Sequence, residues 1–393
     1  MELQNRVGIA QLTTLALQGV DLHPLRSHLL RKCAEDQDQA GALMDLSVID
    51  QLYGDLEQGL AWQARAISAC QLYRTDRGRK GKKTLLVFAL PVDIGSNTPI
   101  EFLVPSADYE IITCYLDPDA DQAFLLPDHD VAFCAAPADS RDAVRFSAAI
   151  RRAFGAAEPR VLNLLDASVR IDRISLQHQV PQTAGLVLPR VIETSRKALQ
   201  GAQRESAIAQ LGGYPVIIRP VGSHAGHGLE KLDSAEGLES YLDRHEGQDF
   251  HLCPYVDCSS AQDGRFRKCR IVFIDGVPYP CHLAIADRWD VWYANAGMKD
   301  HPGRRAEESA FLDTFDSDFA QRHAAALSAL SQSIGLEYFG IDCAEDRNGN
   351  LVVFEADNSL IVHDLECPET FPYKGRHMRR IFAAFRALLA KAG

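Results

Sequence analysis

The stretch from Tyr338 to Asn358 constrains this chain most, because it has the pattern of a β-hairpin that carries acidic side chains. Two apolar, β-prone runs, 338–343 and 351–354, flank the turn sequence Asp-Arg-Asn-Gly at 346–349, so the runs are expected to pair as neighbouring strands. Alternate side chains of paired strands point to one face, and the oxygen-bearing candidates are Asp342, Glu355, Asp357 and Asn358. Mg²⁺ takes few carboxylates and completes its shell with water and nucleotide phosphates. The hairpin therefore predicts a magnesium site that serves a nucleotide.

Only one of Asp357 and Asn358 is expected to be a ligand, because adjacent strand residues point to opposite faces. The plain alternative is a charged hairpin on the surface. It does not explain why the acidic residues are interleaved with Ile341, Phe354 and Ala356.

Length and charge limit the classes of protein that fit. A chain of 393 residues predicts two or three domains, and 46% hydrophobic residues argue against disorder. A net charge of -12 and the lack of a Lys/Arg block argue against nucleic-acid binding. The sequence contains no apolar run of about 18 residues, so it predicts no membrane span. Its ten cysteines are scattered without CxxC pairs, which fits reduced residues of the core. A cytoplasmic protein with small-molecule or peptide substrates is expected.

Residues 1–78 have apolar positions at helical spacing and are expected to be helical throughout. Gly19 and Gly54, each between two such helices, lie 35 residues apart, close to the roughly 34-residue period of tetratricopeptide hairpins. The region is therefore described as TPR-like, with a peptide-binding role. A small helical cap or a dimerisation surface, which would give a homodimer, is the alternative.

After the basic linker 74–83, residues 79–170 alternate short apolar strands with helices. Strands are expected at 84–90, 109–115 and 131–136, and an amphipathic helix at 139–154, which predicts a small α/β unit with a parallel sheet. No phosphate-binding glycine pattern follows its first strand. We therefore expect this unit to bind no nucleotide and to form one wall of a shared substrate cleft.

A second informative stretch begins at Tyr214, where a β-prone run carries Arg219 and leads into a glycine-rich loop. The backbone N–H groups of such a loop are free to close over nucleotide phosphates. A hairpin loop with a permissive backbone is the structural alternative.

Together these segments resemble the ATP-grasp superfamily, in the branch of α-L-glutamate ligases and D-alanine-D-alanine ligases. The resemblance covers about 171–390 and rests on Pro215-Val-Ile-Ile-Arg-Pro220, Gly222-Ser-His-Ala-Gly-His-Gly228, Gly340-Ile-Asp342 and Glu355-Ala-Asp357. It implies an α/β (α+β) protein with an ATP-grasp fold, whose lid and central subdomain span 171–250 and whose C-terminal subdomain, with the magnesium site, spans 251–393. Residues 79–170 would be the pre-ATP-grasp domain.

The resemblance also implies roles for individual residues. Phosphate and nucleotide contacts fall on Arg173, Arg219, Gly222, Ser223, His224, Gly226, Gly228, Tyr255, Val256 and Asp257. Arg219 replaces the usual lysine, and Tyr255 and Val256 would read the adenine edge while Asp257 accepts from ribose. Residues at the reaction centre would be Lys268, Arg270, Arg288 and Asn295. An ordinary core strand is the alternative for the segment at 251–257.

The activity that the resemblance implies is a ligase dependent on ATP and Mg²⁺, which joins a carboxylate to an amine through an acyl phosphate. The substrate would be an amino acid or a peptide. One alternative is a phosphotransferase that stops at a phosphorylated product, for which His282 and His363 are available. The other is a scaffold with a helical repeat that binds nucleotide without turnover.

Overall fold

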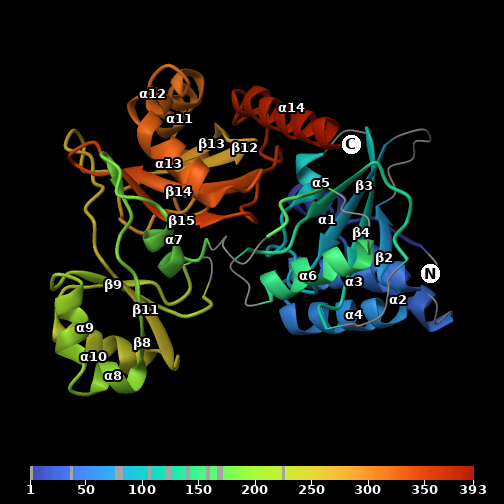
Figure 1. The fold of residues 1–393 in the computed structure, drawn as a ribbon, viewed down its shortest axis with the longest axis horizontal. Helices are drawn as coiled ribbons and strands as arrows, with labels where there is room; N and C mark the ends of the chain where they lie inside the picture. Colours follow the sequence, from blue (N-terminus) through green and yellow to red (C-terminus); the bar gives the residue numbers. More distant parts are fainter. Residues whose placement is uncertain are drawn as a thin grey trace.

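The structure, a computed structural model, describes residues 3–35, 39–75, 83–104, 108–119, 125–138, 142–155, 160–165, 171–223 and 226–393. Within these segments the strands form three sheets, and the protein has the α/β class that its sequence predicts. Figure 1 shows the largest sheet and its helices on one side of the molecule and the two smaller sheets on the other.

The largest sheet has six strands in the order β1-β2-β4-β3-β5-β6. Their bounds are β1 Gln4–Arg6, β2 Leu72–Thr75, β3 Lys83–Ala89, β4 Tyr109–Tyr115, β5 Val131–Cys134 and β6 Val161–Leu162. Strand β3 pairs in parallel with β4 and β5, whereas β2 is antiparallel to β4. The central strands are apolar on both faces because helices cover both.

One face of this sheet is covered by helices that come before and after the predicted domain boundary near residue 78. They are α1 Ile9–Leu17, α2 His23–Glu35, α3 Ala40–Leu52, α4 Leu56–Ala69 and α6 Ala143–Phe154. The expectation that residues 1–78 are wholly helical is wrong, because β1 and β2 join the sheet. Strands of three and four residues carry too few alternating positions to be visible in the sequence, and pairing with β4 stabilises them. The TPR-like repeat stays a prediction.

A four-stranded antiparallel sheet has the order β10-β9-β11-β8. Its elements are β8 Ile192–Ser195, α8 Arg196–Gln200, α9 Arg204–Gln210, β9 Val216–Pro220, β10 Glu230–Leu232, α10 Ala235–Arg244 and β11 Asp249–Pro254. The helices pack on one face, around buried side chains such as Ile218, Leu238 and Phe250. The other face of β9 and β11 carries Arg219 and His251, which are cross-strand neighbours.

A five-stranded sheet has the order β13-β12-β14-β15-β7 and contains the predicted hairpin. Its strands are β7 Leu186–Val187, β12 Phe266–Ile274, β13 Val277–Ala286, β14 Tyr338–Glu345 and β15 Leu351–Asp357. The apolar face packs on helices α11 Pro302–Thr314, α12 Phe319–Arg322 and α13 Ala324–Ile334. The hairpin turn is closed by Gly349, whose N–H donates to the Asp346 carbonyl at 3.0 Å. Short helices α7 Arg173–Gln179 and η1 Met298–Asp300 flank the sheet.

The long helix α14 Lys374–Ala392 joins the five-stranded and six-stranded sheets, and α5 Ile100–Leu103 lies beside it. Its Phe382 and Phe385 belong to the core that also contains Phe133 of β5 and Tyr338 of β14. In Figure 1 this helix lies at the top, between the two parts of the molecule. The β14–β15 hairpin is thereby held against the N-terminal sheet.

Asn358 ties the end of the hairpin to the N-terminal sheet, and its side chain is fully buried. Its Oδ1 accepts from the Ala138 N–H at 2.8 Å, and its Nδ2 donates to the Ala136 carbonyl at 2.8 Å. The Thr98 hydroxyl donates to its backbone carbonyl at 2.9 Å. The amide therefore matches backbone groups that would otherwise be buried without partners.

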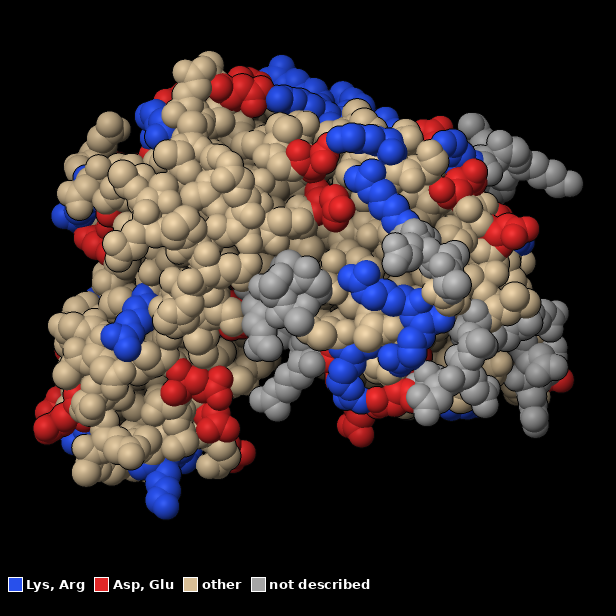
Figure 2. All heavy atoms as spheres, viewed as in Figure 1, with Lys and Arg blue, Asp and Glu red and all other residues tan. Residues whose placement is uncertain are grey.

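Surface charge is mixed on the face drawn in Figure 2. Basic side chains gather over α14 and α6, with acidic side chains beside them. In the described segments no helix is long and apolar enough to cross a membrane. All ten cysteines fall in these segments and are free, as expected from their spacing.

Replacing Asn358 with Ala leaves the Ala138 N–H and the Ala136 carbonyl without their partner. We expect the free energy of unfolding to fall by about 2–4 kcal/mol, measured by urea denaturation. Asn348→Ala at the exposed hairpin turn is the matched control and should change it by less than about 0.5 kcal/mol. Equal stability of the two variants would contradict the role given to Asn358.

Candidate active site

A row of polar side chains crosses the five-stranded sheet. His282 on β13 lies opposite Arg270 on β12, Arg270 lies opposite Asp342 on β14, and Asp342 lies opposite Glu355 on β15. Directly opposed residues point to the same face, so all four side chains share the face that looks away from helices α11 to α13. The row begins at a hairpin predicted from sequence and extends to a strand 60 residues upstream.

Asp342 is held by two cations at the centre of the row. Arg270 donates to both its oxygens, from Nε at 2.8 Å and from Nη2 at 3.1 Å, and Lys268 Nζ lies 2.8 Å from Oδ2. Burial alone would raise the pKa of Asp342, but Arg270 and Lys268 outweigh it and hold that pKa well below its usual range. Asp342 is therefore ionised at every physiological pH. The structure brings together all three residues that the sequence predicted here.

Glu355 and Asp357 lie on the same face as Asp342, because Glu355 is directly opposite Asp342 and Asp357 follows Glu355 by two residues on β15. Glu355 Oε1 forms an ion pair with Arg173 Nη2 at 2.5 Å, so the predicted upstream cation reaches the hairpin. Asp357 accepts from the N–H and the hydroxyl of Ser359, each at 2.8 Å.

The structure separates Asp357 from Asn358 as candidate metal ligands. Asn358 is wrong as a ligand, because its amide points away from the row and is used by Ala136 and Ala138. Asp357 keeps the face shared with Glu355 and stays a prediction as the third ligand.

Arg219 brings the four-stranded sheet to the hairpin. Burial, with nearby Arg173, lowers the pKa of Arg219 to about 10, and Glu355 opposes that change. Its Nε donates to the Ser223 hydroxyl at 3.1 Å, so the guanidinium and the start of the glycine loop lie together. It remains protonated at neutral pH, and Arg173, Arg219 and Glu355 form one group of charges.

The glycine loop begins and ends close to Arg219. Gly222, Gly226 and Gly228 have positive φ angles, between 63° and 77°, which side chains rarely adopt. A Cβ at Gly228 would also lie 2.7 Å from Pro220 Cδ, so only glycine fits there. His224 lies outside the described residues, and its predicted contact stays untested.

The predicted adenine segment follows β11. Tyr255 packs edge-on to Trp289 with ring centroids 6.2 Å apart, and Lys231 Nζ lies 4.5 Å from the centroid of the Tyr255 ring. Val256 packs partly buried beside β14 and β15. Asp257 already forms an ion pair with Arg347 at 3.0 Å, so a ribose hydroxyl would share this carboxylate. The nucleotide roles of these residues remain predictions.

Arg288 and Asn295 do not reach the row. Arg288 pairs with Asp290, and its side chain is 63% exposed. Asn295 closes a local turn by accepting from the Trp292 N–H at 3.0 Å and donating to the Asp290 carbonyl at 2.8 Å. The resemblance implied a place for both at the reaction centre, and short-range hydrogen bonds hold them elsewhere in this structure.

Sequence reasoning missed a buried polar cluster at the edge of β13. Lys374 Nζ lies 2.9 Å from Glu366 Oε1 and 3.3 Å from Glu308 Oε1. Glu308 also accepts from the hydroxyls of Tyr373 at 2.6 Å and Tyr293 at 3.1 Å. These residues are spread over some 80 positions, and no spacing signal connects them. We call them the Lys374 cluster.

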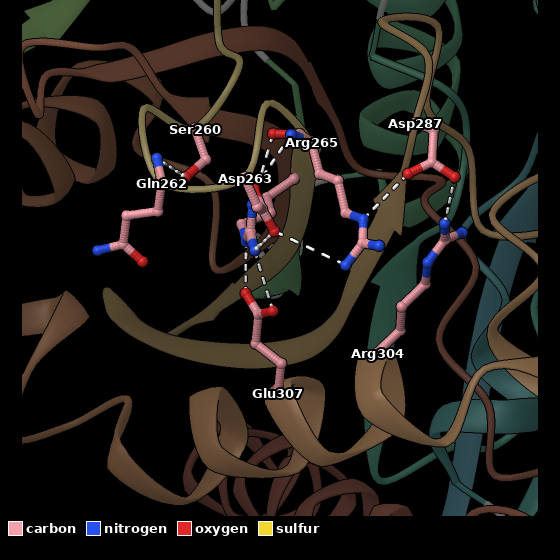
Figure 3. A network of polar contacts seen from close by, with 8 residues as sticks. Ser260, Gln262, Asp263, Arg265, Asp287, Arg304 and Glu307 are labelled. Carbon is pink, nitrogen blue, oxygen red and sulfur yellow. Dashed lines mark hydrogen bonds and ion pairs between the residues drawn. The ribbon is translucent and has the colours of Figure 1, made fainter.

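An ion-pair network fixes the segments that flank this cluster (Figure 3). Arg267 pairs with both Asp263 and Glu307. Asp287 pairs with two arginines: its Oδ1 lies 3.0 Å from Arg265 Nε, and its Oδ2 lies 2.6 Å from Arg304 Nη2. The ends of β12 and β13 are thereby attached to helix α11, which carries Glu308.

The donor set fits Mg²⁺ and a nucleotide, although no ready-made cage is present. In the described part of the chain no group of three or more His, Cys, Asp or Glu side chains is placed to hold a metal alone. Glu355 already forms an ion pair with Arg173, and Asp342 forms ion pairs with Arg270 and Lys268. Hard carboxylate oxygens suit an ion that takes the rest of its shell from phosphates and water. The cationic side chains that pair with these carboxylates suit the phosphate groups of a nucleotide.

Two hollows described in the N-terminal part lie apart from this row. One, of about 60 Å³, is lined by side chains that include Arg6, Glu101 and Thr113. The other, of about 750 Å³, is lined by residues of α4 and by 115–118. Neither contains a residue of the row.

No protein-family model matches the chain, and no curated protein matches its sequence. Several solved structures are similar to it over most of its length. The D-Ala:D-Ser ligase VanG from Enterococcus faecalis is 13% identical with a TM-score of 0.44, over 79% of this chain and 100% of that one. The RimK domain ATP-grasp protein from Sphaerobacter thermophilus is 15% identical with a TM-score of 0.43, over 78% and 99%. The D-alanine-D-alanine ligase from Coxiella burnetii is 8% identical with a TM-score of 0.46, over 79% and 96%. One of these neighbours is described as an ATP-grasp protein, and ATP-grasp is the superfamily that the sequence resembles. A likeness of this degree says nothing of the substrate.

Replacing Glu355 with Gln removes a carboxylate charge from the row while keeping the shape of the side chain. We expect the affinity for Mn²⁺, measured by electron paramagnetic resonance in the presence of ADP, to fall by roughly tenfold or more. Glu369→Gln, on an exposed residue after the hairpin, is the control and should bind as the wild type does. Unchanged binding by the Glu355 variant would remove this residue from the metal site.

Proposed function

We propose that this protein is a ligase dependent on ATP and Mg²⁺ that joins a carboxylate to an amine through an acyl phosphate. The observation that carries the proposal is the group of four cations, Arg173, Arg219, Lys268 and Arg270, around the carboxylates of one hairpin. Phosphoryl transfer demands little covalent chemistry of a protein. It requires positive charge along the β- and γ-phosphates and correct positioning, and this group supplies both.

The carboxylates of the hairpin hold the cations in place in this structure. Arg173 and Arg270 each form charge-assisted hydrogen bonds within the row. Guanidinium groups bind phosphate oxygens through two parallel N–H bonds, so Arg173 and Arg219 fit the β/γ end of ATP. With Arg173 turned to phosphate, Glu355 would be able to hold Mg²⁺ together with Asp342 and Asp357. A metal held there would supply positive charge to the phosphoryl group that is transferred.

The remaining residues position the reactants. Arg270 and Lys268 project from β12 beside Asp342, where they would fix the substrate carboxylate and the acyl phosphate that forms from it. The glycine loop at 222–228 would close over the phosphates and exclude water, which protects the acyl phosphate from hydrolysis. Tyr255 and Val256 would bind adenine through their backbone groups. ATP as a substrate and free cysteines fit a cytoplasmic protein.

A phosphotransferase that stops at a phosphorylated product would use the same cations, and its acceptor would be a histidine such as His363. His363 lies beside Glu366, with Nδ1 and Oε2 3.7 Å apart. Its ring centroid lies 6.1 Å from that of Phe102, and its Nδ1 accepts from the Leu365 N–H at 3.3 Å. His282 is the other histidine available for this reaction, so the experiment below is chosen to separate the two activities.

The proposal predicts an acyl phosphate that hydroxylamine can capture. The protein is incubated with ATP, Mg²⁺, hydroxylamine and a pool of amino acids and short peptides, and hydroxamates are detected by mass spectrometry. A second incubation without hydroxylamine should give products at the sum of two masses minus water.

Arg270→Met should abolish hydroxamate formation, because the acyl phosphate loses its cation, whereas exposed Arg376→Met should not. ADP release with no hydroxamate and no joined product would contradict the ligase and favour the phosphotransferase. No nucleotide turnover at all would favour the scaffold.

A further inference from the structure

His282 occupies a distinctive place at the end of the charged row. It lies directly opposite Arg270, so it is two strands from Asp342 and on the same face. Strand β13 is the edge of the sheet, and the ring is partly exposed there. Arg270, which the proposed function assigns to the acyl phosphate, is therefore next to an imidazole.

The ring of His282 is held in place without using its nitrogens. It packs against Tyr293 with centroids 4.7 Å apart. Tyr293 is fixed by its hydrogen bond to Glu308 and by Lys374, whose Nζ lies 3.9 Å from the Tyr293 ring centroid. No hydrogen bond to either His282 nitrogen is present among the residues that the structure describes. An oriented imidazole with free nitrogens is able to exchange a proton with a bound substrate.

The surroundings keep His282 neutral. Burial comes first, and Arg270 and Lys374 come next, in lowering its pKa well below the usual value, while Asp342 opposes them and Lys268 adds to them. A neutral imidazole has a lone pair for a proton, but burial and the nearby cations disfavour its protonated form, so any proton that it takes has to pass on to water at once. The Lys374 cluster thus acts on His282 both through the Tyr293 ring and through the charge of Lys374.

We propose that His282 is the catalytic proton acceptor for the attacking amine, which reaches the site as an ammonium ion. The inference rests on the proposed ligase activity and adds a residue that the resemblance to known ligases does not include. It also places the amine at the β13 edge of the row, beyond Arg270.

The proton balance of the step is complete. An ammonium nitrogen loses one proton to His282 to gain its lone pair, and that proton passes to solvent. The nitrogen then attacks the carbonyl carbon of the acyl phosphate, and a C–N bond forms as the C–O bond to phosphate breaks. Phosphate leaves with the electron pair and takes the second proton as HPO₄²⁻. The products are an amide, hydrogen phosphate and one proton in solution.

Hydroxylamine separates this step from the formation of the acyl phosphate. It is largely unprotonated at neutral pH, so it attacks without help from a base, whereas an amino acid arrives as an ammonium ion. His282→Gln should therefore form hydroxamate at the wild-type rate. Its kcat for amide formation with the amino-acid pool should fall by about 10²-fold, with little change in the KM for the amine. His377→Gln, on another partly buried histidine, is the control and should match the wild type in both reactions.

Each other outcome contradicts the proposal. Equal amide rates for His282→Gln and the wild type would show that His282 takes no proton. Loss of hydroxamate together with amide would assign His282 to the acyl phosphate step or to the fold. Wild-type hydroxamate without any amide from the pool would contradict an ammonium acceptor at this site. The absence of hydroxamate in the wild type would instead overturn the proposed function itself.

Discussion

The Arg270–Asp342 ion pair is the contact on which the candidate site depends. Both side chains come from neighbouring strands, and Asp342 is 3% exposed, so each charge relies on the other. Removing one partner of a buried pair typically costs about 3–5 kcal/mol because the other is left uncompensated. A chain selected for stability alone has little reason to bury such a pair. A site that must present ionised carboxylate and guanidinium groups to phosphate does have that reason.

Around this pair, three separate parts of the chain bring charge to one place. Helix α7 supplies Arg173, β9 supplies Arg219, and β12 supplies Lys268 and Arg270. Helix α7 and two sheets hold these groups, and the β14–β15 hairpin of the five-stranded sheet is fastened to the N-terminal sheet through Asn358 and Tyr338. The N-terminal sheet therefore fixes the position of the hairpin, and the four-stranded sheet brings the glycine loop to it.

The sequence predicted those parts whose signals are local. The hairpin is confirmed because its turn and alternation lie within twenty residues, and β3, β4 and β5 because their apolar runs are long. Cross-strand partners cannot be obtained this way: the pairing of Arg270 with Asp342 joins positions 72 residues apart. Strands β1 and β2, the burial of Asn358 and the Lys374 cluster all depend on tertiary contacts. Arg288 and Asn295 were assigned to the reaction centre by the family resemblance, and local hydrogen bonds hold them elsewhere.

The transfer of oxygen from the carboxylate substrate to phosphate tests the central claim most directly. The protein would be supplied with Mg²⁺, unlabelled ATP, an amine and a carboxylate labelled with ¹⁸O, and the released inorganic phosphate analysed by mass spectrometry. An acyl phosphate requires one ¹⁸O atom to leave the carboxylate with each phosphate, so the account predicts singly labelled phosphate in amounts equal to the amide. Unlabelled phosphate, with the ¹⁸O label found only in the carboxylate or in its product, would contradict the acyl phosphate and with it the proposed ligase.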